Sequence, residues 1–369
     1  SAFGGYNWAD YGYEKYGTTL FQGLRYTSYA NDGVTWEIAT KHDIGLDMSL
    51  FDDKFTLTID YFHEDRKGIF MCRRHLPATA GVENGMTLPQ ANVGKVLSKG
   101  VDGNLAYKQQ VGSVQLTMRG NMTLSKNEVK DKDEQNNVYP YLMNQAKGLI
   151  ALGLFKDYTD IRNSPQQTFG AYQPGDIKYK DVNGDGIISD MDRVAIGATT
   201  VPNLIYGMGI SAQWKGLDVN LHFQGAGKSS FFINGSGVRP FVNGSKGNIL
   251  KDVVAGRWIS RDESGTESTE NVRAEYPRLS YGGSNNNYQE SSFWLRDGSY
   301  VRLKTLEIGY TLPKPLVNKM HFNNVRIYLI GTNLLTWSKF KMWDPEMNSS
   351  NGAAYPLSKS ITVGLNVNL

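Results

Sequence analysis

The sequence predicts an all-β protein, a transmembrane antiparallel β-barrel with long extracellular loops, and three observations carry this prediction. About nine segments of roughly ten residues alternate apolar and polar side chains, as strands with one apolar and one polar face do. Their connections are alternately short and long, as in outer-membrane barrels. The polar face suits a water-filled lumen better than a packed core, since it carries Arg119, Asn121, Gln213, Asn220 and Gln224.

The first 35 residues lack this alternation. They are rich in tyrosine, glycine and asparagine, so we expect residues 1–35 to be an extracellular loop region with at most one strand. The barrel itself is expected over residues 36–369. A soluble sandwich is the weaker alternative, because its inward side chains would be apolar and it would rarely tolerate four such long loops.

The expected strands follow in order along the chain. Three pairs join through short turns near residues 51–54, 110–113 and 215–217, and a fourth through a moderate link at 313–323. The long links cover residues 67–98, 126–203, 225–292 and 337–358. Within the long links, residues 137–155 and 245–258 are candidates for helices. Strand parity, counted from a periplasmic end at Leu369, places the long links outside the cell.

The strand count predicts that these residues are the C-terminal part of a longer chain. Intact bacterial barrels have an even number of strands, and open strand edges are not viable in lipid. We therefore expect an N-terminal half with a signal peptide to precede Ser1. The net charge of +3 is too small to argue for nucleic acid, and Cys72, the single cysteine, allows no internal disulfide.

Asp181–Asp192 matches the twelve-residue calcium loop D-x-[DN]-x-[DN]-G-x5-E, with Asp in place of the final Glu. Alternate side chains converge on one point and Gly186 allows the sharp turn that the sixth position needs. The predicted ligands of a structural calcium ion are Asp181, Asn183, Asp185, the carbonyl of Ile187, and Asp192. The alternative is a polar turn that binds no ion. Pro202 and a strand follow where an EF-hand sensor would have a helix. We therefore interpret the loop as a site where calcium stabilises the structure rather than a calcium-dependent conformational switch.

Aromatic residues in the long loops are candidate substrate contacts, because sugars stack on exposed rings. The candidates are Tyr172, Trp258, Tyr281, Tyr288 and Trp294. The alternative is that these rings pack the loops or form the interfacial girdle, where Tyr and Trp are enriched. Girdle is the first interpretation for Trp214, Tyr310 and Trp337, which end strands. The five histidines are scattered and no H-E-x-x-H or G-x-S-x-G is present, so no enzyme activity is predicted.

An ordered series of short motifs between residue 175 and the C-terminus resembles a known family. The motifs are Arg193-Val-Ala-Ile-Gly197, Trp214-Lys-Gly-Leu-Asp218, Leu295-Arg-Asp-Gly-Ser-Tyr300, Gly309-Tyr-Thr-Leu-Pro313, Gly331-Thr-Asn-Leu-Leu335 and Asp344-Pro-Glu346. Together they resemble the C-terminal barrel region of SusC/RagA-type TonB-dependent transporters of Bacteroidetes. Leu369 departs from the family pattern, since an aromatic residue usually ends such barrels.

The resemblance implies a Gram-negative outer-membrane importer with a plugged barrel of about 22 strands. It further implies a SusD-like surface lipoprotein as partner, coupling to the TonB complex through the N-terminal part, and glycans or oligopeptides as substrates. Two alternatives stay open at this point. One is an outer-membrane channel or adhesion barrel without TonB coupling, and the other is a soluble calcium-binding, carbohydrate-recognising β protein.

Overall fold

The computed structural model describes residues 7–16, 19–28, 30–73, 76, 88–133, 141–235, 238–241, 249–261, 271, 273–319, 321–347 and 349–368. Its contacts divide the chain into two compact units. The first comprises Ser1–Leu46, Ile59–Asp102 and Ser125–Met143, and the second comprises Asp47–Thr58, Gly103–Leu124 and Asn144–Leu369. Among the described residues, no helix has the length and apolar character that crossing a membrane requires.

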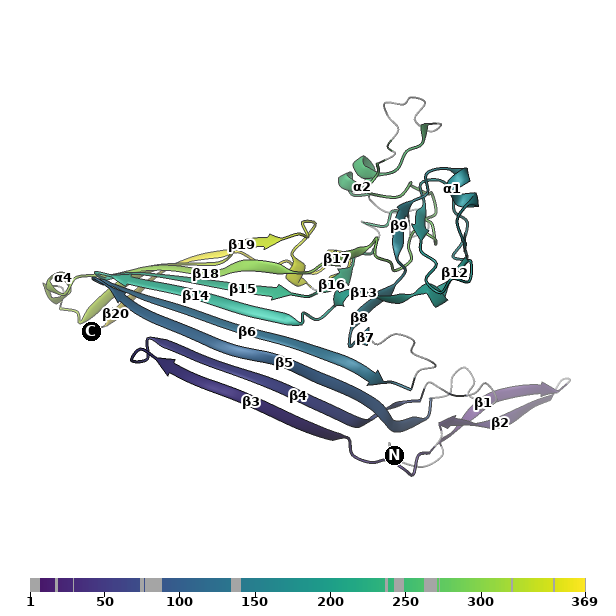
Figure 1. The fold of residues 1–369 in the computed structure, drawn as a ribbon, viewed down its shortest axis with the longest axis horizontal. Coiled ribbons are helices and arrows are strands. Elements are labelled where there is room, and N and C mark those ends of the chain that lie inside the picture. The colour runs from purple at the N-terminus through teal and green to yellow at the C-terminus, as the bar shows by residue number, and fades with distance from the viewer. Residues whose placement is uncertain are drawn as a thin grey trace. The chain divides into compact units, whose positions relative to one another are not determined.

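Nine long strands follow one another, hydrogen-bonded in the order β20-β19-β18-β15-β14-β6-β5-β4-β3, in a ten-stranded sheet to which β7 adds a short pair with β6 (Figure 1). Their bounds are β3 (Ile38–Leu50), β4 (Phe55–Cys72), β5 (Gln90–Val111), β6 (Val114–Asp131), β14 (Leu204–Trp214), β15 (Leu217–Gly227), β18 (Tyr300–Thr311), β19 (Asn324–Ser338) and β20 (Ser360–Asn368). The predicted all-β fold is confirmed, and each strand expected from the alternation is present.

Several strands are longer than the alternation indicated. The strand β5 has 22 residues, and β4 and β6 have 18 each. Sequence patterning ended these strands early because their far halves carry charged residues on both faces, for example Lys95, Lys99 and Asp102 in β5. Apolar alternation marks a strand only where one of its faces is apolar.

Tight turns connect the strands at one end, as predicted. Between β14 and β15, Lys215 and Gly216 both have positive φ, of 45° and 89°. Two-residue turns with positive φ at both positions match the right-handed twist of the strands that they join. The link between β18 and β19 contains the helix α4 (Lys314–Lys319).

The N-terminal segment differs from the expectation of at most one strand. Residues 7–28 contain two strands, β1 (Asn7–Tyr16) and β2 (Thr19–Ser28), which pair with each other in antiparallel register. The prediction of a mainly irregular loop was therefore wrong in its secondary structure. The aromatic residues that made this segment unlike the alternating strands also favour extended backbone, so composition alone did not exclude a hairpin.

Register places apolar side chains in rows across the second unit. Leu116 pairs with Ala212, Ala212 with Val219, Val219 with Ile308 and Ile308 with Leu329. The large members of this face are exposed to the outside of the sheet, as Ile308 and Leu329 show with 40% and 41% of their surface accessible. A continuous exposed apolar face on a sheet is the lipid-facing side of a membrane barrel.

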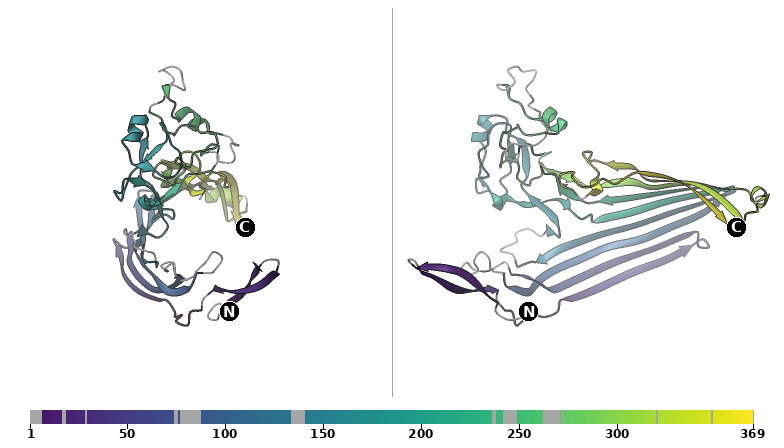
Figure 2. Two further views of the ribbon diagram at one scale, coloured as in Figure 1. Left: turned by 90° about the vertical axis from the view of Figure 1, so that its right-hand side faces the viewer. Right: turned by 180° about the vertical axis from the view of Figure 1, so that it is seen from behind.

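The described parts of the long connections of the second unit fold into a compact group of short elements, the loop module (the described residues among 144–199, 229–297 and 339–350). It contains β8 (Gln145–Gly148), β9 (Ala151–Leu154), α1 (Tyr158–Arg162), β10 (Gln166–Gln167), β11 (Ile177–Tyr179), β12 (Ile187–Ile188), the 3-10 helix η2 (Asp190–Asp192), β13 (Val194–Thr199), β16 (Ser230–Phe232), α2 (Lys251–Gly256), β17 (Leu295–Asp297) and the 3-10 helix η3 (Pro345–Met347). Figures 1 and 2 show α1 and α2 gathered at one end of β14–β19 and α4 at the other.

The loop module has its own apolar core, centred on Leu149, Ile177, Tyr179, Ile188 and Trp294. The helix candidate at residues 137–155 was wrong, since its described part, from residue 141, forms β7 (Tyr141–Leu142), β8 and β9. The candidate at residues 245–258 contains α2, although residues 245–248 lie outside the described ones.

Candidate functional site

The polar face of the sheet is the first candidate site, and register assembles it residue by residue. Thr117 pairs with Ser211, Ser211 with Asn220, and Asn220 with Glu307, across β6, β14, β15 and β18. These residues alternate with the apolar rows, so they point to the opposite side of the sheet. A barrel closed from such strands would place this face in its lumen.

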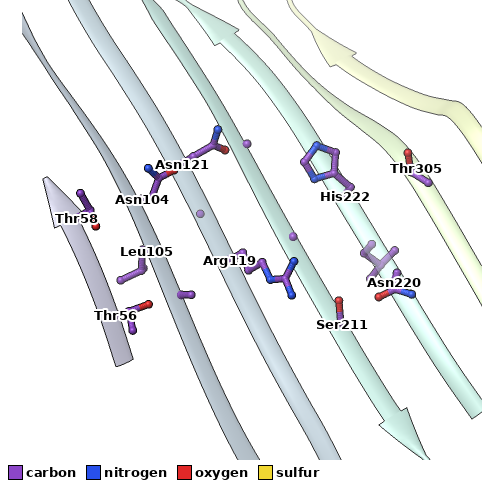
Figure 3. Close-up of a pocket in the computed structure, with 15 residues that line it drawn as sticks. Thr56, Thr58, Asn104, Leu105, Arg119, Asn121, Ser211, Asn220, His222 and Thr305 are labelled. Carbon is purple, nitrogen blue, oxygen red and sulfur yellow. The ribbon is translucent and has the colours of Figure 1, made fainter. Parts of the chain in front are cut away.

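A hollow of about 520 Å³ lies on this face within the second unit. Figure 3 shows its labelled side chains, which are Thr56, Thr58, Asn104, Leu105, Arg119, Asn121, Ser211, Asn220, His222 and Thr305. They offer hydroxyl, amide, guanidinium and imidazole groups but no carboxylate, so the hollow favours neutral polar or anionic ligands.

Glycines on the polar face make room for their larger neighbours. A Cβ atom at Gly207 would lie within 3 Å of Oδ1 of Asn121, which is its register partner on β6. At Gly209, by contrast, the nearest heavy atom to such a Cβ would be 3.8 Å away. The first glycine therefore accommodates Asn121, and the second leaves open space beside Arg119 and His222.

An ion-pair cluster lies on the same face nearer the tight turns. The guanidinium of Arg326 on β19 donates from Nε to Asp218 on β15 across 3.1 Å, and from Nη2 to Glu307 on β18 across 2.5 Å. The hydrogen bonds of this guanidinium thus join three adjacent strands. The guanidinium also lies 5.1 Å from the ring centre of Tyr328. Such a fork of hydrogen bonds is geometry that Arg provides and Lys does not.

At the other end of β18, a buried arginine holds the connection between β19 and β20. Arg302 is fully buried and donates from Nη2 to both oxygens of Asp344, at 2.6 and 2.7 Å. Its Nη1 lies 3.1 Å from Oε2 of Glu346. The Asp344-Pro-Glu346 motif is therefore an anchor that fixes this loop to the sheet. A buried arginine is tolerated because these two carboxylates compensate its charge.

A second hollow, of about 640 Å³, lies where the loop module meets the strands of the second unit. Aromatic and acidic side chains line it together, among them Phe231, Phe232, Tyr300, Glu290 and Glu346. Glu346 belongs to both this wall and the Arg302 anchor. The position of the β19–β20 connection therefore determines the shape of this hollow.

Inside the loop module, a buried polar network joins segments that are distant in sequence. Gln167 donates from Nε2 to Oδ1 of Asn286 across 2.6 Å, and Asn287 donates from Nδ2 to Oδ1 of Asp176 across 2.8 Å. Arg278 pairs with the same Asp176 at 2.9 Å. Asp176 and Asn286 are fully buried. Buried polar groups specify one arrangement when they are all satisfied, so this network fixes how the two long connections meet.

The calcium-type loop is folded by its own side chains. Asp181 accepts backbone N–H bonds from Gly184 and Gly186, at 2.6 and 2.8 Å. Asp192 is fully buried and accepts from the N–H groups of Val182 and Ser189, both at 2.8 Å. Asp192 therefore draws the two ends of the loop together.

The donor set of this loop fits calcium in chemistry, since it offers carboxylate, amide and carbonyl oxygens. Within the described residues, however, no group of three or more His, Cys, Asp and Glu side chains is gathered as around a metal ion. Asn183 and Asp185 instead hydrogen bond to each other at 2.9 Å, and Asp185 also accepts from the N–H of Ile187. The calcium assignment stays a prediction.

The five candidate aromatic residues do not form one surface. Trp258 and Trp294 are buried, with 8% and 1% of their surface exposed, and the indole of Trp294 donates to the carbonyl of Asn287. Tyr172 stacks on Phe155 with ring centres 5.4 Å apart. These contacts cover the rings, which is the packing role that the sequence left as the alternative.

Tyr288 and Tyr281 behave differently from each other. Tyr288 lies beside Trp294 and donates its hydroxyl to the carbonyl of Pro240, and burial raises the pKa of Tyr288 to about 12. Tyr281 is 85% exposed and is the one candidate of the five with a largely free ring. Its role in substrate contact stays a prediction.

Trp214 and Tyr310 fall in one row through Leu217, which pairs with both, and Trp214 and Trp337 are about half exposed. The girdle assignment is compatible with these positions, and it too stays a prediction.

Sequence reasoning missed the Arg302 anchor and the Asp176 network as sites. Asp344 was already present in a recognised motif, and the available signal for Arg302 was a charged residue within an expected strand, two positions after Tyr300. No comparable signal marked Gln167 or Asn286, because asparagine and glutamine are common in exposed loops.

Comparison with known proteins identifies the protein family to which this chain belongs. The family described as "TonB dependent receptor-like, beta-barrel" matches residues 3–334. The chain belongs to this family. TonB-dependent receptor P26 of Formosa agariphila is 28% identical over 379 residues, which cover 94% of this chain and 36% of that receptor. TonB-dependent receptor P3 of the same organism is 28% identical over 392 residues, which cover 96% of this chain and 36% of that receptor.

Solved structures agree with the family. The RagAB peptide transporter matches with a TM-score of 0.69 and 21% identity, covering 99% of this chain and 38% of that one. The RagAB importer in its open-open state matches with a TM-score of 0.70 and 20% identity, with the same coverage. At these identities the likeness shows the fold. The resemblance to a SusC/RagA-type TonB-dependent barrel region is thereby confirmed, and the chain spans about a third of the length of these relatives.

Proposed function

We propose that this chain is the C-terminal barrel region of an outer-membrane, TonB-dependent importer of glycans or oligopeptides. The observation that carries the proposal is the pairing of an exposed apolar face with a hollowed polar face on one sheet, in a chain of the TonB-dependent receptor family. A neutral or anionic solute would meet hydroxyl, amide and basic groups along this face.

Partners follow from the same family. RagAB is described as a peptide transporter, and the resemblance in motifs extends to systems with a SusD-like lipoprotein. We propose that such a lipoprotein covers the loop module, and that the TonB complex acts on the N-terminal part of the full-length receptor. An outer-membrane channel without TonB coupling is less well supported, since the matching relatives are TonB-dependent receptors.

A calcium ion in the Asp181–Asp192 loop forms part of the proposal. Asp181, Asn183, Asp185, the carbonyl of Ile187, and Asp192 would hold it, and its charge would offset the repulsion of these carboxylates. The ion would order an external segment, with no part in transport chemistry.

To test transport, one substitution narrows the lumen of the full-length receptor, and a matched substitution on the opposite face serves as the control. Gly209→Trp places an indole on the polar face, where the structure leaves space. Met208→Trp places the same indole on the opposite face, where Met208 is 49% exposed. We expect Gly209→Trp to lower uptake of the cell's glycan or peptide substrate and Met208→Trp to leave it near wild type. Equal uptake by both variants, at equal surface abundance, would contradict the proposal.

A further inference from the structure

We propose that the outward face of the first unit carries a binding surface for the phosphate groups of a membrane-embedded glycolipid. The surface, the basic row, consists of His42 on β3, His63 and Lys67 on β4, Lys95 and Lys99 on β5, and Lys126 and Lys130 on β6. The inference rests on the proposed outer-membrane location and concerns the lipid rather than the transported substrate.

Alternation puts these residues on the apolar, outward side of their strands. On β3, His42 lies on the same face as Ile44 and Leu46, whose side chains are 72% and 54% exposed. On β4, His63 lies on the same face as Ile59 and Tyr61, whose side chains are 38% and 42% exposed. The two histidine rings face each other across the neighbouring strands, with centres 6.2 Å apart. Side chains at every second position share one face of a strand.

The lysines of β5 and β6 extend this surface. Lys99 and Lys126 stand at equal distances from the turn that joins Val111 to Val114, so antiparallel pairing puts them opposite each other. Lys126 and Lys130 both flank Glu128, at 3.8 and 2.7 Å, and Lys99 is close enough to act on the same carboxylate. The basic row therefore crosses all four strands.

The surface keeps an excess of positive charge after its internal ion pairs are counted. Its carboxylates are Asp65, which pairs with Lys67 at 3.0 Å, Glu128, and Asp131, which lies 4.0 Å from Lys95. Five lysines against three carboxylates leave two positive charges (5 − 3 = 2) with neutral histidines. Lys95 and Lys126 remain 52% and 51% exposed, so their ammonium groups are accessible to an external anion.

The height of the basic row on the barrel identifies its ligand. From Phe55 beside the tight turn to His63, β4 has about nine residues, the length that a tilted strand needs to cross the hydrocarbon layer. Ammonium groups are costly inside that layer but are favoured at its polar boundary, where anionic headgroups lie. A phosphorylated glycolipid of the outer leaflet has its acyl chains against the apolar rows and its phosphates level with the lysines. Charge and position together select this ligand.

The test uses the full-length receptor reconstituted in detergent, with purified lipopolysaccharide as the probe. Lys99→Gln with Lys126→Gln removes two charges from the row. Each lysine near a charged headgroup layer contributes roughly fivefold in affinity, so we expect about tenfold or greater weakening of lipopolysaccharide binding, measured by native mass spectrometry. Lys314→Gln with Lys319→Gln removes two exposed charges from α4 and should leave binding unchanged. Lys99→Arg with Lys126→Arg should retain binding.

Two further arms separate the lipid from other phosphate sources. Dephosphorylated lipopolysaccharide should bind no more tightly to wild type than to the Gln variant, and inorganic phosphate at millimolar concentration should not displace the intact lipid. The folded state of each variant is verified by its heat-modifiable mobility in gels. Equal binding of intact lipopolysaccharide by wild type and the Gln variant would overturn the proposal. Because this readout is lipid binding, its failure is distinguishable from a failure of substrate import.

Discussion

Asn287 donates a hydrogen bond from Nδ2 to Oδ1 of Asp176 across 2.8 Å, although 111 residues separate them in the chain. Asn287 also accepts from the N–H of Ile177 at 2.8 Å. This pair links the long β6–β14 connection to the long β15–β18 connection. Two of the three segments of the loop module are therefore folded against each other at a common end of the sheet.

Replacing Asp176 with Ala should open the loop module while the sheet persists. The change leaves Arg278, only 15% exposed, without its carboxylate, and breaking a buried pair costs about 3 kcal/mol or more. Hydrogen exchange at the N–H of Ile177 should accelerate about a hundredfold. Asp190→Ala is the matched control, since Asp190 is 79% exposed and its ion pair with Arg193 stabilises little. Unchanged exchange in Asp176→Ala would contradict the role assigned to the network.

Replacing Arg302 with Met should release the β19–β20 connection. Asp344 and Glu346 then lose the buried guanidinium that holds them, at a cost of about 3 kcal/mol to the anchored state. Limited proteolysis should cut between residues 340 and 358 much faster than in wild type. The Lys339→Met variant, which loses an exposed ion pair with Asp297, should be cleaved at the wild-type rate. Identical cleavage patterns for both variants would show that Arg302 is not the anchor.

Chelation should loosen the Asp181–Asp192 loop and leave the barrel folded. Without the ion, Asp181, Asp185 and Asp192 repel one another, and the loop is shaped only by hydrogen bonds to the backbone and the bond between Asn183 and Asp185. Protease digestion with and without EGTA measures the effect, and Asp185→Ala should be insensitive to the chelator. A loop that resists protease equally in both conditions would argue against a structural ion.

Acid should weaken α1 within the loop module. The ammonium of Lys178 donates to Asp160 at 2.7 Å and holds the pKa of this carboxyl below its usual value of 3.8. A depressed pKa means that the stabilisation is complete above 3.8 and is lost as the pH falls further through the folded-state value. The protection factor for exchange at the N–H of Asn163, which bonds to the carbonyl of Thr159, should fall below that pH in wild type and already be low in Lys178→Met. A protection factor that does not change with pH would contradict this linkage.

The sheet could be predicted from the sequence because lipid on one side and water on the other impose a period of two. Residues such as Ile210 and Ser211 record that environment locally, and each strand is recognised without knowing its partner. The far halves of β4, β5 and β6 escaped prediction because charges such as Lys99 interrupt the period where the strand leaves the apolar layer.

The loop module could not be predicted, since its short strands depend on partners distant in sequence. The strand β10 has two residues and pairs with β12, and its Gln167 is fixed by Asn286 from another connection. Nothing local in such segments selects a strand. Aromatic composition likewise cannot separate a buried ring such as Trp294 from an exposed one such as Tyr281, because both occur among similar loop residues.

Energy-dependent uptake in intact cells tests whether this chain belongs to a TonB-dependent importer whose polar face lines the substrate path. Cells expressing the full-length receptor would be given labelled oligopeptides and glycans, with TonB intact or disrupted, beside cells carrying Gly209→Trp or Met208→Trp. We expect TonB-dependent uptake of one substrate class, lowered by Gly209→Trp and preserved by Met208→Trp. Uptake that persists without TonB, or that is unchanged by the indole on the polar face, would contradict the proposed function.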